Sequence, residues 1–499
     1  MGELSRLPLR DDMQAPSTSV QWSTVPLTPA PTGLTVWRAS SPWQTVRSMV
    51  GLVLVCFFIA QLSVFLVGGM VDGDFNGTPG PLEPVYTLVG GVCLAPLLLL
   101  FFHLRRPRLT HSVRAAPHPH GGTVHPLSGG LVVQAQQPVE VRHHVFRSNA
   151  PLEMPRPLHL WGLFVGGVTL STVCLLPLSV FGVTPFTVLL GLMVVLPAWL
   201  VGFAAPVFGW WSITSRHMGI TVSRRDAEWM LAAGMLSTIP AIVINSLISP
   251  IGVHAVGLDA FETGSWGEGM ILFISAPVGE ELSKALAVVL LGHLIVSPKH
   301  GFYVGSTVGL GFALLENAQY IFMALLSEQS GLAYFFTATL RGLSSIPGHA
   351  MWTGLSGYAI GHTLQRSAVA RSAIQRSPFL TPDPEANWVL YDRDGQPTAS
   401  TGWASDPSAR MEALLRRHER HAWRMPTEPW AGVGLAMLGH ALWNGSSWGV
   451  GRALSNTDPG LALMLELAWL VLMVVALWFC ILRWLPTAVL GENSRLRSP

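Results

Sequence analysis

The stretch ISAPVGEELSKALAVVLLGHLIV, from Ile274 to Val296, is long and apolar enough to cross a membrane, yet it contains Glu280, Glu281 and Lys284. A membrane-spanning helix needs about 20 mostly apolar residues. A charged side chain near the bilayer centre costs at least ~2.5–3.5 kcal/mol on insertion scales. Three charges in one span therefore indicate buried partners and a function rather than contact with lipid.

The composition of the whole chain is typical of a polytopic membrane protein. Hydrophobic residues make up 50% of the 499 residues and charged residues only 12%, whereas soluble domains carry about 25% charged residues. The net charge of +2 gives no indication of nucleic acid binding. The four cysteines lie far apart within apolar runs, so they predict neither a disulfide framework nor a metal site.

About ten apolar segments are long enough to span a bilayer, which predicts an all-α, polytopic transmembrane helical bundle. The first of them begins too far into the chain, and is too long, to be a cleaved signal peptide. Residues 1–48, which precede it, are rich in Pro, Ser and Thr and are predicted to be disordered. The segments lie near residues 49–70, 85–104, 158–181, 185–210, 227–251, 269–296, 301–326, 333–363, 430–451 and 460–484.

Basic residues concentrate in alternate loops between these segments, above all in residues 105–157 and 366–429. The other loops, such as residues 71–84 and 252–269, contain no Lys or Arg. The positive-inside rule therefore predicts that both large loops and both termini are cytoplasmic. This orientation agrees with an even number of spans in a multi-pass protein of the cell membrane.

The two large loops are interpreted as solvated segments with the usual charge bias. A contact with a metal or with anionic lipid is the alternative. The second loop contains the basic sequence ARMEALLRRHERHAWR, which is a candidate for a short helix. The first loop contains His111, His118, His120, His125, His143 and His144.

Four consecutive spans, between residues 269 and 451, carry polar side chains. Residues four apart share one face of a helix, as Glu280 and Lys284 do, so side chains within each span are expected to point together. At about 1.5 Å per helical residue, the two glutamates and the two histidines reach a similar depth near the membrane midplane. The polar residues are Glu280, Glu281, Lys284, Glu316, Asn317, Tyr320, Arg341, His349, His440 and Asn444.

Two carboxylates and two histidines at one depth suit hydrolysis. A carboxylate can take a proton from water as a general base, and Asn444 offers an amide donor for the negative charge that develops. The set also fits a divalent metal such as zinc, with His349, His440 and Glu281 as candidate ligands. A membrane transporter or a non-catalytic membrane scaffold that uses the same buried polar residues is the alternative function.

The motifs EELSKAL, GLGFALLENAQY, RGLSSIPGHAMWTGLSGYAIG and LGHALWN occur in this order on consecutive spans. Over roughly residues 265–450 the chain resembles the PrsW family of intramembrane proteases, which is grouped with the CAAX prenyl endopeptidases and the bacterial CPBP proteins. The resemblance implies an intramembrane endopeptidase that hydrolyses membrane-anchored proteins, such as anti-sigma factors. It does not account for the first five spans or for the large loops.

The resemblance divides the chain into four parts. Residues 49–264 are an N-terminal transmembrane region, residues 265–451 a catalytic core, and residues 452–499 a last span with a cytoplasmic tail, preceded by the segment 1–48.

The resemblance also implies roles for the polar residues. In the related prenyl endopeptidases the first glutamate of the pair, with a histidine, is thought to activate water. Glu280 is therefore predicted to be the general base and Glu281 its electrostatic support, because neighbouring helical residues point about 100° apart. The basic residue departs from the prenyl endopeptidase pattern, since Lys284 comes three residues after Glu281 instead of four. The catalytic set is Glu280, Glu281, His349, His440 and Asn444, supported by Lys284, Glu316, Asn317, Tyr320 and Arg341.

Overall fold

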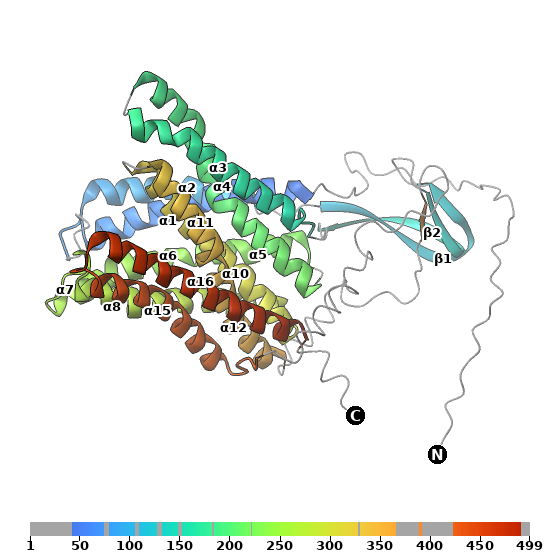
Figure 1. The fold of residues 1–499 in the computed structure, drawn as a ribbon. Coiled ribbons are helices and arrows are strands. Elements are labelled where there is room, and N and C mark those ends of the chain that lie inside the picture. The colour runs from blue at the N-terminus through green and yellow to red at the C-terminus, as the bar shows by residue number, and fades with distance from the viewer. Residues whose placement is uncertain are drawn as a thin grey trace, which may run out of the picture. The chain divides into compact units, whose positions relative to one another are not determined.

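The computed structural model describes residues 42–73, 79–104, 109–126, 132–147, 152–181, 184–220, 222–327, 330–365, 389–391 and 423–490. These residues are almost entirely helical, which confirms the all-α membrane class (Figure 1). The chain divides into a helical unit, made of residues 39–108, 148–382 and 406–499, and a small unit that holds the strands. Most of the predicted basic helix within residues 366–429 lies outside the described residues. Of the segment 1–48, which was predicted to be disordered, residues 1–41 also lie outside them, whereas residues 42–48 are helical.

The described residues of the helical unit form ten successive helical segments, several of them broken by short turns of different pitch. Seven proline residues begin these segments, because proline fits the first position of a helix, where its missing N–H is not needed. The helices are α1 (Pro42–Val71), α2 (Pro84–Leu104), α3 (Pro157–Phe181), α4 (Pro185–Met218), α5 (Arg224–Leu236), α6 (Thr238–Val243), η1 (Ile244–Ile248), α7 (Ser249–Ala255), α8 (Trp266–Met270), η2 (Ile271–Ser275), α9 (Ala276–Leu290), η3 (Gly292–Leu294), α10 (Pro298–Leu326), α11 (Ser330–Leu343), α12 (Ser345–Gln365), α15 (Pro429–Ala453) and α16 (Pro459–Leu490).

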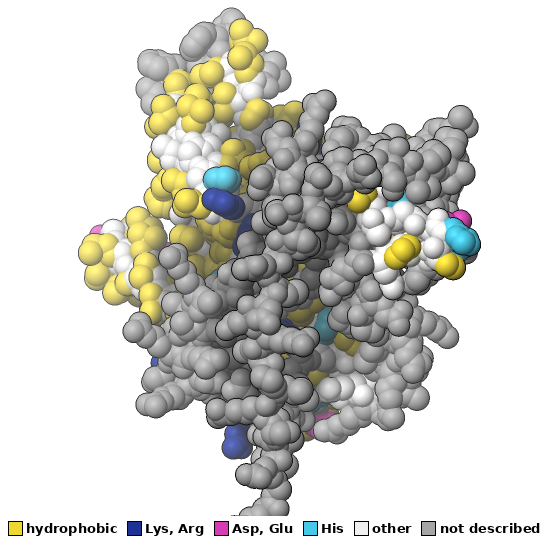
Figure 2. All heavy atoms as spheres, turned by 90° about the vertical axis from the view of Figure 1, so that its right-hand side faces the viewer, with side chains coloured by type: hydrophobic (Ala, Val, Ile, Leu, Met, Phe, Trp, Pro, Cys, Tyr) yellow, Lys and Arg dark blue, Asp and Glu magenta, His cyan; other side chains and the backbone are white. Residues whose placement is uncertain are grey.

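Seven stretches of the described chain are helical, long and apolar enough to cross a membrane. The remaining three predicted spans coincide with η2–α9, with α11–α12 and with α15, which carry the charged and polar side chains. In Figure 2 hydrophobic side chains make up much of the coloured surface at the left, as expected for a surface that faces lipid. The seven stretches are Trp43–Val71, Pro84–Leu104, Pro157–Pro177, Leu189–Met218, Arg224–Ala255, Pro298–Leu326 and Pro459–Val489.

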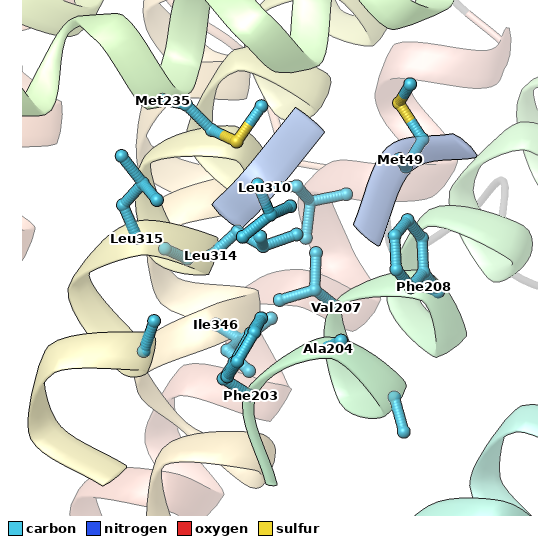
Figure 3. Packing of buried hydrophobic residues seen from close by; sticks show 14 of the residues in the cluster. Met49, Phe203, Ala204, Val207, Phe208, Met235, Leu310, Leu314, Leu315 and Ile346 are labelled. Atoms are coloured by element: carbon cyan, nitrogen blue, oxygen red, sulfur yellow. The ribbon is translucent and has the colours of Figure 1, made fainter. Parts of the chain in front are cut away.

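Helix α10 is the central element of the helical unit. Nearly all of its residues are buried, and it packs against α4, α5 and α12. Figure 3 shows the apolar core beside it, where Met49 of α1, Phe203 of α4 and Met235 of α5 meet Leu310 and Leu314 of α10. Ile346 and Ala350 join α12 to this core, whereas Ala287 and Val288 of α9 belong to a second apolar cluster that also contains residues of α10 and α12.

Helices α10 and α12 approach closely because small residues face each other along them. A Cβ atom added at Gly305 would run into the Thr353 carbonyl oxygen, and one at Gly309 into the carbonyl oxygen of His349. Small residues of this kind let two membrane helices pack with their backbones in contact. The close packing fixes the height of His349 relative to α10.

The segment 105–157, which was interpreted as a solvated loop, contains two β-strands that the sequence analysis did not predict. Strand β1 (Leu109–Pro126) pairs with β2 (Val132–Arg147) in an antiparallel hairpin, and β3 (Val389–Tyr391) pairs with β2. The alternating valines of the second strand favour this conformation, because β-branched residues suit a pleated strand. Within the described chain, His118 and His120 are exposed, and His125 is buried with its Nε2 2.9 Å from the Gly122 carbonyl oxygen.

Candidate active site

Helix α9 carries the three charges that were noted in the sequence, and all three are buried. Lys284 Nζ lies 2.7 Å from Glu281 Oε1 and 3.3 Å from Glu280 Oε2. It also donates to His349 Nδ1 at 2.9 Å and lies 3.9 Å from the centre of the Phe312 ring. The ammonium group is therefore the positive centre around which two helices place their acidic and basic side chains.

His440 comes to this centre from α15. Its Nδ1 lies 3.0 Å from Glu281 Oε1, and its Nε2 lies 3.8 Å from Glu280 Oε2. The ring stacks on Trp352 of α12, with 4.7 Å between the centroids and 15° between the planes. A carboxylate paired with Lys284 only accepts hydrogen bonds, so the proton of a neutral His440 is on Nδ1 and the lone pair is on Nε2.

His349 is also oriented by a carboxylate, but through its other ring nitrogen. Its Nε2 donates to Glu316 Oε2 of α10 at 2.7 Å, while its Nδ1 accepts from Lys284. The rings of His349 and His440 lie 5.1 Å apart at 89°. Each histidine thus has one nitrogen on a carboxylate, His440 on the buried Glu281 and His349 on the half-buried Glu316. The lone pair of the other nitrogen is turned away from that carboxylate.

Arg341 of α11 holds Glu316 in position. Its Nη2 lies 2.9 Å from Glu316 Oε1 and donates to Ser345 Oγ at 3.1 Å, while its Nε donates to Asn317 Oδ1. The guanidinium group lies 3.8 Å from the centre of the Tyr320 ring. The predicted supporting residues of α10 and α11 therefore form one network that ends at His349.

A cavity of about 1000 Å³ opens beside these groups within the helical unit. Glu280, Glu316, His349, His440 and Asn444 line it, whereas Glu281 and Lys284 do not. The cavity extends from these residues toward the loops that follow α7 and α15. Its wall there includes Thr263, Gly264, Glu268, Trp448, Arg452, Ser455, Asn456 and Glu466.

Three side chains on the cavity wall are placed so that they could bind one metal ion. Glu280, His349 and His440 each offer one ligand atom, and these atoms lie within 4.8 Å of one another. A histidine that binds a metal usually donates its other N–H to a carboxylate, and Glu316 and Glu281 supply that second contact here. The residues present therefore fit a divalent cation. The sequence suggested Glu281 as a ligand, but Glu281 contacts the opposite nitrogen of His440, and Glu280 takes this place.

Asn245 is part of the site and was missed in the sequence. It lies on η1, lines the cavity and donates from Nδ2 to Glu280 Oε1 at 3.1 Å. The sequence could have indicated it, because Asn245, like Asn444, is a polar amide residue inside an apolar span. Trp352, which stacks on His440, gave no signal, since a tryptophan in a membrane helix is common.

Residues 224–380 match the family model described as PrsW family intramembrane metalloprotease. This part of the chain is PrsW-like. The resemblance that the four motifs predicted is thereby confirmed over this region, and the match supports an intramembrane protease. No curated protein and no solved structure matches the chain.

The PrsW-like region differs from the predicted one at both ends. It begins at α5, so it includes Asn245, and it ends before the LGHALWN motif of α15. Glu280, Glu316 and His349 lie inside it, whereas His440 and Asn444 lie outside. The donor set is therefore completed by a helix that follows the matched region.

Proposed function

We propose that the protein is an intramembrane endopeptidase that hydrolyses peptide bonds of membrane-anchored proteins at Glu280, His349 and His440. The observation that supports this most strongly is their convergence on one cavity, with a second carboxylate behind each histidine. Two histidines and a glutamate, with an open side for water, are the donor set of several catalytic zinc sites. A single-span protein such as an anti-sigma factor is the expected class of substrate.

We infer further that the centre is metal-dependent. Glu280 would hold the ion with His349 Nδ1 and His440 Nε2, the two nitrogens that no carboxylate engages at hydrogen-bond distance. When bound, such an ion supplies a Lewis acid that activates water and polarises a carbonyl. Lys284 now donates to His349 Nδ1, so its ammonium must turn toward Glu281 when His349 binds an ion.

The protein's own residues would then orient the substrate and stabilise charge. Glu316 and Glu281 keep each imidazole in one tautomer and one orientation. Arg341 lines the cavity and carries a fixed positive charge, and Asn444 offers an amide N–H. Donors of this kind stabilise the oxyanion that forms when water attacks a peptide carbonyl.

A glutamate mechanism without metal is the second candidate, and one observation favours it. The Lys284 ammonium already lies among Glu280, Glu281 and His349, so the protein itself supplies a positive charge at this place. In this mechanism Glu280 takes the proton from water as a general base. Its side chain is the one of the pair that lines the cavity.

The cavity wall favours a protease over a transporter. Its outer part comes from residues next to the loops 256–265 and 454–458, which are predicted to lie on one side of the membrane. None of the residues that line it belongs to a predicted cytoplasmic loop. A transporter needs access from both sides, whereas a protease needs access for its substrate from one.

The test is cleavage of a tagged single-span protein by the purified protein in liposomes. Glu280→Gln keeps the size and removes the basic oxygen, so the rate should fall about 10²–10⁴-fold in a protein that is still folded and inserted. A strong chelator should abolish cleavage and added zinc should restore it if a metal is used. Full activity in Glu280→Gln would contradict both mechanisms, and full activity after chelation would leave only the glutamate mechanism.

A further inference from the structure

Buried polar atoms without a hydrogen-bond partner are rare in folded proteins, so each one calls for an explanation. Nine buried side-chain atoms of the described residues have none. Two of the nine belong to residues that line the cavity, namely Asn245 Oδ1 and Trp448 Nε1. One is an acceptor and the other a donor, which is the pair of groups that a peptide main chain also offers.

The orientation of Asn245 is fixed by chemistry. Glu280 Oε1 can only accept, so the amide of Asn245 must turn its NH₂ group toward it, at 3.1 Å. The carbonyl oxygen is then directed away from that carboxylate oxygen while the side chain as a whole remains on the cavity wall. Asn245 lies on the π-helical turn η1, and such turns occur often at functional sites.

Trp448 lies on the same face of α15 as the proposed catalytic residues. His440, Asn444 and Trp448 follow one another at intervals of four residues, and all three line the cavity. The indole ring packs where Gly269 has no side chain, and its centre lies 5.5 Å from that of Trp266. The ring is thus held in place while its N–H has no partner.

We propose that Asn245 and Trp448 form a main-chain-binding subsite for an extended segment of the protein substrate. The Asn245 carbonyl would accept from one peptide N–H, and the Trp448 indole would donate to one peptide carbonyl. This inference rests on the proposed protease function and adds how the substrate is held. Neither atom is open to solvent in the unbound protein, so the substrate must displace the side chains that cover them.

The subsite has a direct consequence for substrate choice. In a helix the main-chain N–H and C=O groups are already bonded to each other, whereas an extended segment leaves them free. The subsite therefore binds only those parts of a membrane-anchored protein that are unwound next to Glu280. Segments with glycine or proline near the cleaved bond should be favoured, because these residues weaken a helix.

The donor is tested with Trp448→Phe, which keeps the ring and removes the N–H. Loss of one hydrogen bond should raise KM for a single-span reporter about 5–10-fold and leave kcat within about twofold. Thr353→Val is the matched control. It removes the hydroxyl oxygen of Thr353 on α12, which is also buried without a hydrogen-bond partner but does not line the cavity. An unchanged KM in Trp448→Phe would overturn the assignment of Trp448.

The acceptor needs a different test, because Asn245→Ala also removes the contact to Glu280 and lowers kcat. Reporters in which successive peptide bonds are replaced by esters lack one N–H each. In the wild type, one ester position should raise KM about 5–10-fold, and in Asn245→Ala the same ester should have no further effect. Equal sensitivity of both proteins at every position would overturn the assignment of Asn245.

Binding of a fluorescent single-span peptide, measured beside cleavage, separates the two proposals. If the wild type binds the peptide but cuts no reporter, and both Trp448→Phe and Asn245→Ala raise the Kd, the protease function is contradicted and the subsite is kept. If the wild type cuts the reporter and neither substitution changes the Kd or the KM, the subsite alone is overturned.

Discussion

Lys284 is fully buried and contacts Glu280, Glu281 and His349. Its side chain has 0% exposure, and Glu281, which is also fully buried, is its nearest carboxylate. An ion pair of this kind contributes little net stability over an apolar pair of the same volume, but removing one partner leaves the other charge buried and uncompensated. The pair therefore fixes the arrangement of the site more than it stabilises the fold.

The first prediction concerns this pair. Glu281→Leu should destabilise the protein by about 3–5 kcal/mol, because the Lys284 ammonium loses its closest partner. The double variant Glu281→Leu with Lys284→Met should recover most of that loss, since both charges are then gone. Thermal unfolding in detergent measures the stability of both variants. If Glu281→Leu is as stable as the wild type, Lys284 does not depend on Glu281 to compensate its charge.

The second prediction concerns the contact behind His349. Glu316→Gln should weaken zinc binding about 10–100-fold, because the carboxylate that orients the imidazole is lost. Competition with a coloured chelator measures the affinity without any substrate. Glu268→Gln is the control, since Glu268 also lines the cavity but contacts neither histidine. Equal affinities in the two variants would argue against a role of Glu316 in metal binding.

The different positions of the two glutamates could be predicted from the sequence, since neighbouring residues point to different sides of a helix. The structure places Glu280 on the cavity wall and Glu281 behind it, between Lys284 and His440. The carboxylate that each histidine contacts could not be predicted, because it depends on how α10, α12 and α15 cross. The roles of these residues in catalysis remain predictions.

At the scale of elements, the contact between α10 and α12 determines where the site forms. The glycines of α10 bring its backbone against α12, and His349 lies within that contact. The helices themselves were predictable from long apolar runs and from the prolines that begin them. The π-helical turns η1 and η2 were not, because a one-residue change of helical pitch leaves no mark in the apolar pattern.

The third prediction tests this contact. Gly309→Ala places a methyl group against the His349 carbonyl oxygen, so α12 must shift, and the expected cost is about 1–3 kcal/mol together with a loss of cleavage. Gly162→Ala on α3 is the matched control, because nothing lies within 4 Å of the added atom. Thermal unfolding and reporter cleavage are measured on both. Identical behaviour of the two variants would show that the close packing is not needed.

At the scale of the whole molecule, the orientation in the membrane decides from which side a substrate enters the cavity. The positive-inside rule places the loop before α8 and the loop after α15 outside the cytoplasm. Asn456 and Gly264, which line the cavity, belong to these loops. The number of spans and the position of the termini stay predictions from loop charge.

The fourth prediction tests the orientation. In a variant without the native cysteines, Asn456→Cys should react with a membrane-impermeant maleimide added to intact cells. Lys299→Cys, in the first turn of α10 at the end that is predicted to face the cytoplasm, should react only after the membrane is permeabilised. Mass-tagging gels measure both reactions. The reverse pattern would show that the cavity opens toward the cytoplasm.

The central claim is that Glu280, His349 and His440 hydrolyse a peptide bond of a membrane-anchored protein. Mass spectrometry of a reporter incubated with the protein in liposomes, in water enriched in ¹⁸O, tests it most directly. The wild type should produce two fragments with ¹⁸O in the new carboxyl terminus, and inserted Glu280→Gln should produce none above background. Equal yields from both proteins, or no cut fragment with any single-span reporter, would contradict the claim.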